Sequence, residues 1–305
     1  RKKYITVFGG EPLLSGPARK EAVETIVSRS KEAGLSLCFV TNGYYLEEYL
    51  PILRKGIIRE IQVTLDGVEK VHDGRRFLRG GGGTFRKIVR GIDACLAEGI
   101  GINLRMVVDK ENIGSLPGLA RFAIDKGWTK NPDFKTQIGR NYELHHCQSA
   151  PDNLFDRISL YEKIFELVKA NPHITEFYKP AYSVTKFLAG NGELPDPLFD
   201  SCPACKTEWA FDYTGKIYSC TATVGKTEES LGTFYPVVTK KEHIIERWES
   251  RDVTSIPECK SCNVRLACGG GCGSVSKNRT GNICSPDCRP VKELMELGFS
   301  AYFQS

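Results

Sequence analysis

The sequence lacks the features that mark membrane-spanning and nucleic-acid-binding proteins. No apolar run approaches the roughly 20 residues that are needed to cross a bilayer. No dense basic run with interleaved aromatic residues occurs, and 42 basic against 37 acidic residues leave a net charge of only +5. We therefore expect neither a membrane nor a nucleic acid among the partners of this protein.

No signal peptide is visible at the start of the sequence. The chain opens as Arg1-Lys2-Lys3-Tyr4 and continues at once into a predicted strand. Because this start contains no Met, we expect the natural protein to begin earlier.

Cysteine is the residue type that is unusually frequent. The 305-residue chain, long enough for a substantial core, contains 12 cysteines. Nine of them follow residue 200, at positions Cys202, Cys205, Cys220, Cys259, Cys262, Cys268, Cys272, Cys284 and Cys288. Disulfide frameworks belong mainly to small secreted domains with poor cores, whereas tight Cys-x-x-Cys pairs in a chain of this kind favour metal binding in a reducing compartment. The composition thus predicts a cytoplasmic metal-binding protein, with disulfides as the alternative.

Strands and helices alternate through the first half of the chain. Apolar runs predict strands at 4–8, 35–40, 60–65, 101–108 and 134–138, with helical periodicity at 19–33, 45–55, 85–98 and 112–126. This alternation indicates an α/β fold with a parallel sheet, which places ligand-binding residues at the C-terminal ends of its strands. Polar clusters follow three of these strands: Gly9-Gly10-Glu11-Pro12, Thr41-Asn42-Gly43 and Asp66-Gly67.

A Pro-rich segment at 194–198 suggests a linker after two further predicted helices, at 154–170 and 180–192. We therefore predict an N-terminal domain at 1–192 and a second domain at 193–305. In the second domain, Tyr213-Thr214-Gly215 predicts a hairpin, 243–248 a short helix, 259–288 a Gly-rich loop and 289–298 a closing helix. His145-His146-Cys147 is either a metal site or a surface turn.

The spacing of the late cysteines is specific. Cys205 is separated from Cys220 by nine residues, Gly215 and four residues; Cys259-x2-Cys262-x5-Cys268-x3-Cys272 follows, and Cys288 precedes the closing helix. This string resembles the seven-cysteine signature of the SPASM domain of radical S-adenosylmethionine (SAM) maturases, which holds two auxiliary [4Fe-4S] clusters. The resemblance implies one cluster on Cys202, Cys205, Cys220 and Cys272, and a second on Cys259, Cys262, Cys268 and Cys288.

Chemistry agrees with this assignment, because a cubane cluster requires four soft thiolates that loops present from several directions. The run Gly269-Gly270-Gly271 would let the backbone approach inorganic sulfide and donate N–H groups to it. Cys284 is then either a free thiol or an alternative fourth ligand. Structural zinc is the other interpretation, since two Cys-x-x-Cys pairs make one Cys₄ site, but it leaves Cys220, Cys268, Cys272 and Cys288 unexplained.

The N-terminal region carries a second resemblance to the same family. Gly9-Gly10-Glu11-Pro12 is similar to the GGEP motif of radical SAM enzymes, which meets the amino group of the bound methionine moiety; a Glu carboxylate complements an ammonium group. The resemblance implies that Thr41, Asn42, Thr64 and Asp66 contact the sugar and sulfonium parts of SAM. Arg105, in the fourth predicted strand, either meets the cofactor carboxylate or points outward.

The family's Cys-x3-Cys-x2-Cys loop, which binds the catalytic cluster, is absent from this sequence; before residue 200 the cysteines are Cys38, Cys95 and Cys147. The family's barrel has six βα units, and the sequence predicts five. The resemblance therefore implies a partial (β/α)6 TIM-like barrel without its first unit, followed by a small Cys-rich α+β SPASM domain. We expect the missing unit and a third [4Fe-4S] cluster upstream of Arg1; the chain as given could not cleave SAM.

The implied activity is that of an oxidoreductase that modifies a peptide or protein side chain by crosslinking or oxidation. In such enzymes a flavodoxin- or ferredoxin-like donor gives one electron to the catalytic cluster, and the cluster passes it to SAM. The resulting 5′-deoxyadenosyl radical abstracts a substrate hydrogen. The auxiliary clusters accept an electron or ligate the substrate. Anaerobic sulfatase maturation (formylglycine formation) is the nearest alternative, although its enzymes have Asp where this chain has Thr221. A non-catalytic zinc or iron–sulfur module that binds a partner is the other alternative.

Overall fold

The computed structural model describes residues 3–140 and 151–303, and these form two compact units. The first unit ends at Pro180 and the second begins at Ala181. The predicted domains, 1–192 and 193–305, remain a prediction; in the structure, helix α8 (Thr185–Asn191) belongs to the second unit, where it packs against α12 (Val291–Phe303). The segment His145-His146-Cys147 lies outside the described residues.

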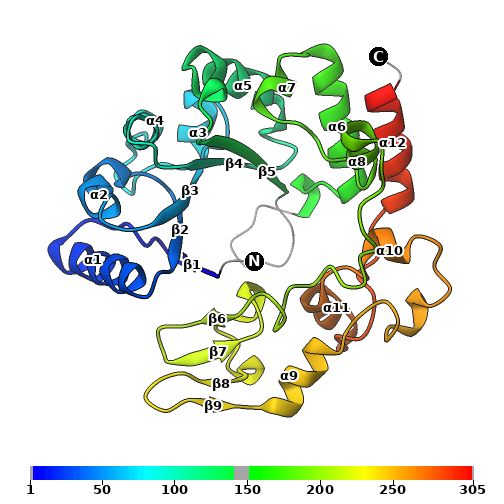
Figure 1. Ribbon diagram of the computed structural model, residues 1–305. Coiled ribbons are helices and arrows are strands. Elements are labelled where there is room, and N and C mark those ends of the chain that lie inside the picture. Colours follow the sequence, from blue (N-terminus) through cyan, green and yellow to red (C-terminus); the bar gives the residue numbers. More distant parts are fainter. Residues whose placement is uncertain (1–2, 141–150, 304–305) are drawn as a thin grey trace. The chain divides into compact units, whose positions relative to one another are not determined.

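The first unit is built on a five-stranded parallel sheet, as the alternation of strands and helices predicts (Figure 1). Its strands stand in sequence order: β1 (Tyr4–Val7), β2 (Ser36–Thr41), β3 (Ile58–Thr64), β4 (Ile102–Val108) and β5 (Phe134–Arg140). The helices are α1 (Pro17–Glu32), α2 (Leu46–Leu53), α3 (Glu69–Arg75), α4 (Phe85–Ala97), α5 (Leu116–Asp125), α6 (Arg157–Ala170) and α7 (Ile174–Phe177). This arrangement confirms the predicted α/β partial barrel.

The core lies between one face of the sheet and helices α1, α2, α4 and α5, which cover that face (Figure 1). In β4, every second side chain is buried, beginning at Ile102 and ending at Val108, and Ile88 and Ile92 of α4 pack against this face. Each such side chain contributes about 1.5–3 kcal/mol through burial. Trp128 closes the far end of this core; its indole Nε1 donates a hydrogen bond to Asp93 Oδ1 at 2.8 Å.

The opposite face of the sheet carries polar side chains. Register places Gln62 beside Asn103 and Thr64 beside Arg105, and all four are half-buried. On the same face, Glu60 Oε1 accepts a hydrogen bond from Asn103 Nδ2 at 3.4 Å, and the Glu60 carboxylate pairs with Lys135. Parallel strands are normally buried on both faces by apolar side chains, whereas this face carries half-buried polar ones, among them the predicted site residues Thr64 and Arg105.

Strand β1 forms one edge of the sheet and pairs with β2. Tyr4 and Ile5 are 49% and 40% exposed there, and Phe8, just beyond the strand, is 43% exposed. Exposed apolar residues on an edge strand make an open template for a further strand.

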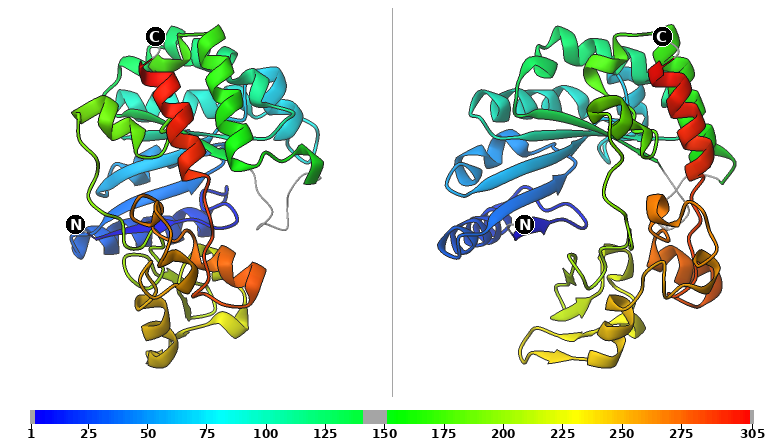
Figure 2. Two further views of the ribbon diagram at one scale, coloured as in Figure 1. Left: turned by 90° about the vertical axis from the view of Figure 1, so that its right-hand side faces the viewer. Right: turned by 45° about the vertical axis from the view of Figure 1, so that its right-hand side comes forward.

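The second unit contains a small antiparallel sheet and helices that frame the cysteines. Its strands are β6 (Ala210–Phe211), β7 (Lys216–Tyr218), β8 (Gly232–Thr233) and β9 (Thr239–Lys240), and β6–β7 is the predicted hairpin. Its helices are α8, α9 (Glu242–Glu249), α10 (Arg265–Cys268), α11 (Gly273–Thr280) and α12, shown in red in Figure 2. The region expected to be a Gly-rich loop therefore contains two helices.

Short 3₁₀ turns complete both units, at Ile113–Ser115, Trp128–Lys130, Pro151–Asn153, Thr221–Thr223, Thr227–Glu229 and Pro257–Cys259. Among the described residues, no helix is both long and apolar enough to cross a bilayer.

Candidate functional site

Glu11 joins the loops that follow β1 and β2. Its Oε1 accepts hydrogen bonds from the Leu13 amide at 2.9 Å and the Thr41 hydroxyl at 2.5 Å, and its Oε2 accepts one from the Asn42 amide at 2.6 Å. The Asn42 side chain in turn accepts from the Tyr44 amide at 2.8 Å. The structure thus brings together the predicted residues Glu11, Thr41 and Asn42 at the C-terminal end of the sheet.

This arrangement leaves the Glu11 carboxylate able to take one further donor. An ionised carboxylate has about four acceptor positions, and the three protein donors fill two on Oε1 and one on Oε2. Gly9 and Gly10 precede it with φ of +92° and +56°, and a Cβ at either position would meet no atom within 4 Å. Pro12 then turns the chain away from the strand. An ammonium group approaching Oε2 would therefore find an oriented anion beside an open stretch of backbone.

Thr64, the last residue of β3, lies beside Arg105 in the middle of β4, and the Leu65 amide donates to the Arg105 carbonyl at 2.9 Å. The Arg105 side chain runs along β5, where a Cβ at Gly139 would lie 2.7 Å from its Nε. Glycine at position 139 therefore provides the room that this guanidinium occupies.

Asp66, by contrast, is buried and engaged by the protein. Its Oδ2 accepts from Arg76 Nε at 2.7 Å and its Oδ1 from the Val107 amide at 3.1 Å, while its own amide donates to His72 Nδ1 at 3.1 Å. Asp66 therefore ties the end of β3 to β4 and α3, and its role toward SAM stays a prediction.

His72, fully buried, completes this network. Because Nδ1 accepts a hydrogen bond from Asp66, Nε2 carries the proton and donates to Thr84 Oγ1 at 3.0 Å. Burial lowers the pKa of His72 to about 4, although the nearby Asp66 carboxylate acts in the opposite direction. The imidazole is therefore neutral at pH 7.

The first predicted thiol group, Cys202, Cys205, Cys220 and Cys272, is brought together in the second unit. The Cys202 thiol hydrogen-bonds to Cys272, which raises the pKa of Cys202 and lowers that of Cys272. Cys272 also caps the N-terminus of α11, whose first amides favour the thiolate. Burial, followed by the charges of Glu249, Cys220 and Cys202, raises the pKa of Cys205 to about 12.

Two local features support a special role for this group. Cys205 has a φ of +60°, a left-handed conformation that costs a non-glycine residue about 1–2 kcal/mol. The Cys220 sulfur lies 3.2 Å from the hydroxyl oxygen of Ser274, in the first turn of α11. Strained backbone of the kind seen at Cys205 clusters at functional sites and ligand clamps.

The second predicted thiol group, Cys259, Cys262, Cys268 and Cys288, lines a cavity of about 90 Å³. Burial, followed by the charges of Cys268, Cys288 and Cys262, raises the pKa of Cys259, and Arg251 opposes the rise. Among the described residues, no group of three or more His, Cys, Asp or Glu side chains converges closely enough to hold a single metal ion. The four thiols instead surround a volume, and their assignment as ligands stays a prediction.

The run Gly269–Gly271 connects the two thiol groups, between Cys268 of the second and Cys272 of the first. All three glycines have φ between +65° and +72°. A Cβ at Gly271 would lie 2.0 Å from the Asp287 carbonyl oxygen, and one at Gly269 would lie 2.7 Å from the Ser201 amide nitrogen. Glycine is required here because neighbouring backbone approaches this connector closely.

Sequence reasoning missed the charged residues that flank the cysteines. Asp200 accepts a hydrogen bond from the Cys202 amide at 3.0 Å, and Asp287 accepts one from the Cys272 amide at 3.2 Å. Arg251 is fully buried among these segments. The positions of Asp200 and Asp287, each within two residues of a cysteine, were the available signal. Cys284 is half-buried and packs against the core that contains Cys202, Cys205 and Cys220.

Comparison with known sequences gives similarity to one superfamily. Residues 1–123 match the sequence model of the Radical SAM superfamily. The chain is 30% identical over 116 residues to Fe-coproporphyrin III synthase of Methanosarcina barkeri, covering 38% of this chain and 27% of that protein. It is 34% identical over 130 residues to GTP 3′,8-cyclase of Caulobacter vibrioides, covering 41% and 35%. The GTP 3′,8-cyclase of Campylobacter fetus is 27% identical over 172 residues, covering 55% and 50%. The chain therefore spans about a quarter to a half of these curated relatives.

Solved structures resemble the chain over nearly its whole length. Native anSMEcpe with bound AdoMet superposes with a TM-score of 0.67 at 16% identity, covering 98% of this chain and 82% of that one. Native anSMEcpe with bound AdoMet and Kp18Cys peptide gives a TM-score of 0.64 at 17% identity, covering 99% and 83%. At this identity the likeness shows the fold, which includes both the partial barrel and the Cys-rich region.

Proposed function

We propose that this chain is the barrel and C-terminal region of a radical SAM enzyme that modifies a peptide or protein side chain. Three independent observations support the proposal: the superfamily match over residues 1–123, the fold shared with a protein solved with bound AdoMet, and the two thiol groups of the second unit. The fold shared with a protein that was solved with a bound peptide favours a peptide or protein substrate.

In the proposed cofactor site, Glu11 receives the amino group of SAM, and Gly9 and Gly10 offer backbone groups beside it. The remaining acceptor position on Glu11 Oε2 and the open space at both glycines support this assignment. Thr41 and Asn42 hold the carboxylate in place, and Thr64 and Arg105 face the same polar side of the sheet. Bound beside a reducing cluster, SAM supplies the 5′-deoxyadenosyl radical that abstracts a substrate hydrogen.

In the proposed auxiliary sites, Cys202, Cys205, Cys220 and Cys272 hold one [4Fe-4S] cluster, and Cys259, Cys262, Cys268 and Cys288 hold another. The observation that carries this proposal is the cavity that the second four thiols line, because a cubane requires a volume between its ligands. When bound, such clusters transfer single electrons. The residues of this chain orient the thiolates and bury them from water.

We further propose that a strand preceding β1 carries the Cys-x3-Cys-x2-Cys loop of the catalytic cluster. The exposed apolar residues Tyr4, Ile5 and Phe8 at the β1 edge of the sheet favour such a neighbour. Sequencing of the gene upstream of the codon for Arg1 tests this point. Three cysteines at the family spacing support it, and their absence in the native protein contradicts it.

A formylglycine-forming activity on sulfatases is the second candidate, since the chain shares its fold with anSMEcpe. Thr221 follows Cys220 and is exposed, and its amide donates to Glu208 at 3.1 Å. The Glu208 carboxylate therefore lies next to Thr221, where the sulfatase-maturating enzymes have the carboxylate of an Asp. Incubation of the catalytically complete protein with a sulfatase peptide, followed by mass spectrometry for the aldehyde, separates this candidate from crosslinking.

Metal analysis of the anaerobically reconstituted 305-residue chain is the primary test. We expect about eight irons and eight sulfides per chain, with a brown visible absorption. One zinc per chain without colour would contradict the cluster assignment and favour a structural zinc module.

A further inference from the structure

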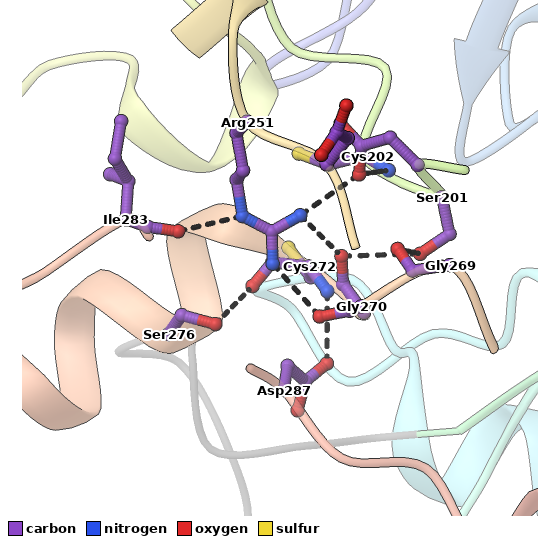
Figure 3. A network of polar contacts seen from close by, with 12 residues as sticks. Ser201, Cys202, Arg251, Gly269, Gly270, Cys272, Ser276, Ile283 and Asp287 are labelled. Atoms are coloured by element: carbon purple, nitrogen blue, oxygen red, sulfur yellow. Dashed lines mark hydrogen bonds and ion pairs between the residues drawn. The ribbon is translucent and has the colours of Figure 1, made fainter. Parts of the chain in front are cut away.

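We propose that Arg251 is a positioning residue that joins the two thiol groups and raises the reduction potentials of the clusters they hold. The inference rests on the proposed function, because it presumes that both auxiliary clusters form. It is carried by the contacts of one buried guanidinium with the segments on which the cysteines lie (Figure 3).

Arg251 has no exposed surface and donates to three segments of the second unit. Its Nη2 donates to the Gly270 carbonyl at 2.8 Å and its Nη1 to the Gly271 carbonyl at 3.3 Å, which fixes the connector between Cys268 and Cys272. Its Nε donates to the Ile283 carbonyl at 2.6 Å, in the segment that leads to Cys288. A planar group with five donors is suited to hold several carbonyls in one arrangement.

The same guanidinium reaches the segment that carries Cys202. Arg251 Nη1 pairs with Asp200 Oδ1 at 2.9 Å, and that same oxygen accepts the Cys202 amide. Arg251 therefore contacts the segment before Cys202, the connector, and the segment before Cys288. A change at this residue is transmitted to both thiol groups through the backbone.

The local charge balance is positive in this buried region. Asp200 is the shared partner of two cations, because its Oδ2 pairs with Lys206, whose ammonium also donates to the Arg251 carbonyl at 2.7 Å. The buried Asp287 carboxylate is the next anion of this network, and it pairs with Arg279 at 3.5 Å. Three cations therefore face two carboxylates, which leaves one positive charge in excess. Such an excess is costly unless further negative charge lies nearby. Thiolate-ligated clusters on either side would supply it.

A buried cation beside an anionic cluster favours its reduced form, because reduction adds one negative charge. The charge on Arg251 should therefore hold the potentials of the auxiliary clusters above the values they would have without it. This makes Arg251 a determinant of how readily the auxiliary clusters accept an electron, through charge and position and without contact with substrate.

The test uses four variants of the full 305-residue chain, reconstituted with iron and sulfide. Arg251→Met removes the charge and the donors, Arg251→Lys keeps the charge but loses the planar fork, and Asp200→Asn removes the countercharge. Arg247→Met is the matched control, since Arg247 is an exposed arginine of helix α9, four residues before Arg251 and outside its network of contacts. Iron content is measured first, and a one-electron potentiometric titration monitored by electron paramagnetic resonance follows.

We expect Arg251→Met to shift the cluster potentials in the negative direction, Asp200→Asn to shift them in the positive direction, and Arg247→Met to leave them unchanged. Arg251→Lys should keep the potentials near those of the unmodified chain but alter the magnetic interaction between the two reduced clusters. If Arg251→Met does not retain iron, the sign of the shift in Asp200→Asn decides. Full iron content with unshifted potentials in both charge variants would overturn this inference alone, whereas absence of iron from the unmodified chain would overturn the proposed function.

Discussion

The backbone amide of Cys272 donates a hydrogen bond to the Asp287 carboxylate at 3.2 Å. In return, the Asp287 amide donates to the Gly270 carbonyl at 3.1 Å. Cys272 belongs to the first thiol group, and Asp287 directly precedes Cys288 of the second. The two proposed cluster sites therefore share backbone, and substitutions between them affect both, whereas substitutions within one group affect chiefly that group.

Replacement of Cys259 by Ser is expected to remove about four of the eight irons, because a hydroxyl is a poor replacement for one of four thiolates. Iron and sulfide analysis after anaerobic reconstitution measures the loss. Cys284→Ser is the matched control, because Cys284 stands outside both proposed ligand sets, and it should retain all the iron. Iron loss in the Cys284 variant together with retention in the Cys259 variant would contradict the ligand assignment.

Gly271→Ala is expected to reduce iron at both sites, since the new Cβ would lie 2.0 Å from the Asp287 carbonyl oxygen. Gly281→Ala provides the comparison. Gly281 has a similar φ of +74° but no atom within 4 Å of the added Cβ, so it should lose only about 1–2 kcal/mol of stability through backbone strain. Iron analysis and thermal unfolding of both variants distinguish the close approach from the strain. Equal iron content in the two would contradict this prediction.

Thr41→Val removes the hydroxyl that donates to Glu11 while leaving the carboxylate present. We expect it to lower the free energy of unfolding by about 1 kcal/mol, the usual contribution of one such hydrogen bond.

Glu11→Gln should cause a loss of stability similar to that of Thr41→Val. It should in addition weaken SAM binding by the catalytically complete protein, because the anion that faces the ammonium is gone. Urea denaturation followed by circular dichroism, with calorimetric SAM titration, measures both effects. Equal SAM affinity in Glu11→Gln and the unmodified protein would refute the proposed role.

Stability should fall as the pH decreases from about 6.5 toward 4, in part because of His72. Its pKa is about 4 in the folded protein and near 6.5 when unfolded, so the unfolded state binds the extra proton over this window. The pKa difference of His72 contributes on the order of 3 kcal/mol to the free energy of unfolding, and this contribution is fully present above pH 6.5. His72→Gln should show a shallower decline in urea midpoint across this range. Parallel pH profiles for the two proteins would argue against a buried neutral imidazole.

Much of the first unit could be predicted from sequence, because its strands are short apolar runs that end at glycine or polar turns. The predicted strand at 101–108 and the observed β4 at Ile102–Val108 differ by one residue. Residues 35–40 were predicted for β2, which extends through Thr41. Helix α3 was not predicted, because Glu69–Arg75 is too short and too polar to show helical periodicity. The helix is held instead by the buried contacts of His72 with Asp66 and Thr84.

The cysteine region shows where sequence reasoning ends. Spacing and family resemblance were enough to divide the thiols into two groups, and the structure brings the members of each group together. Helix α11 was not expected, since Gly273 and three Ser or Thr residues disfavour helix by propensity. Cys272 occupies the N-cap position of this helix, a position that its residue type does not predict. The burial of Arg251 could not be predicted either, because its guanidinium bonds only to residues 19 or more positions away and so carries no local signal.

The position of Trp128 gives the first unit a fluorophore of its own. The other two tryptophans, Trp209 and Trp248, belong to the second unit, and Trp248 packs in the same core as Cys202, Cys205 and Cys220. A chromophore bound by those thiolates would absorb the emission of Trp248 through energy transfer, while the indole of Trp128 stays held by Asp93 inside its aromatic core. Emission from the cluster-loaded protein should then come chiefly from the barrel. The increase in emission when iron is chelated should come from the Cys-rich unit. One optical experiment can therefore follow the unfolding of the barrel and the loss of the cluster separately.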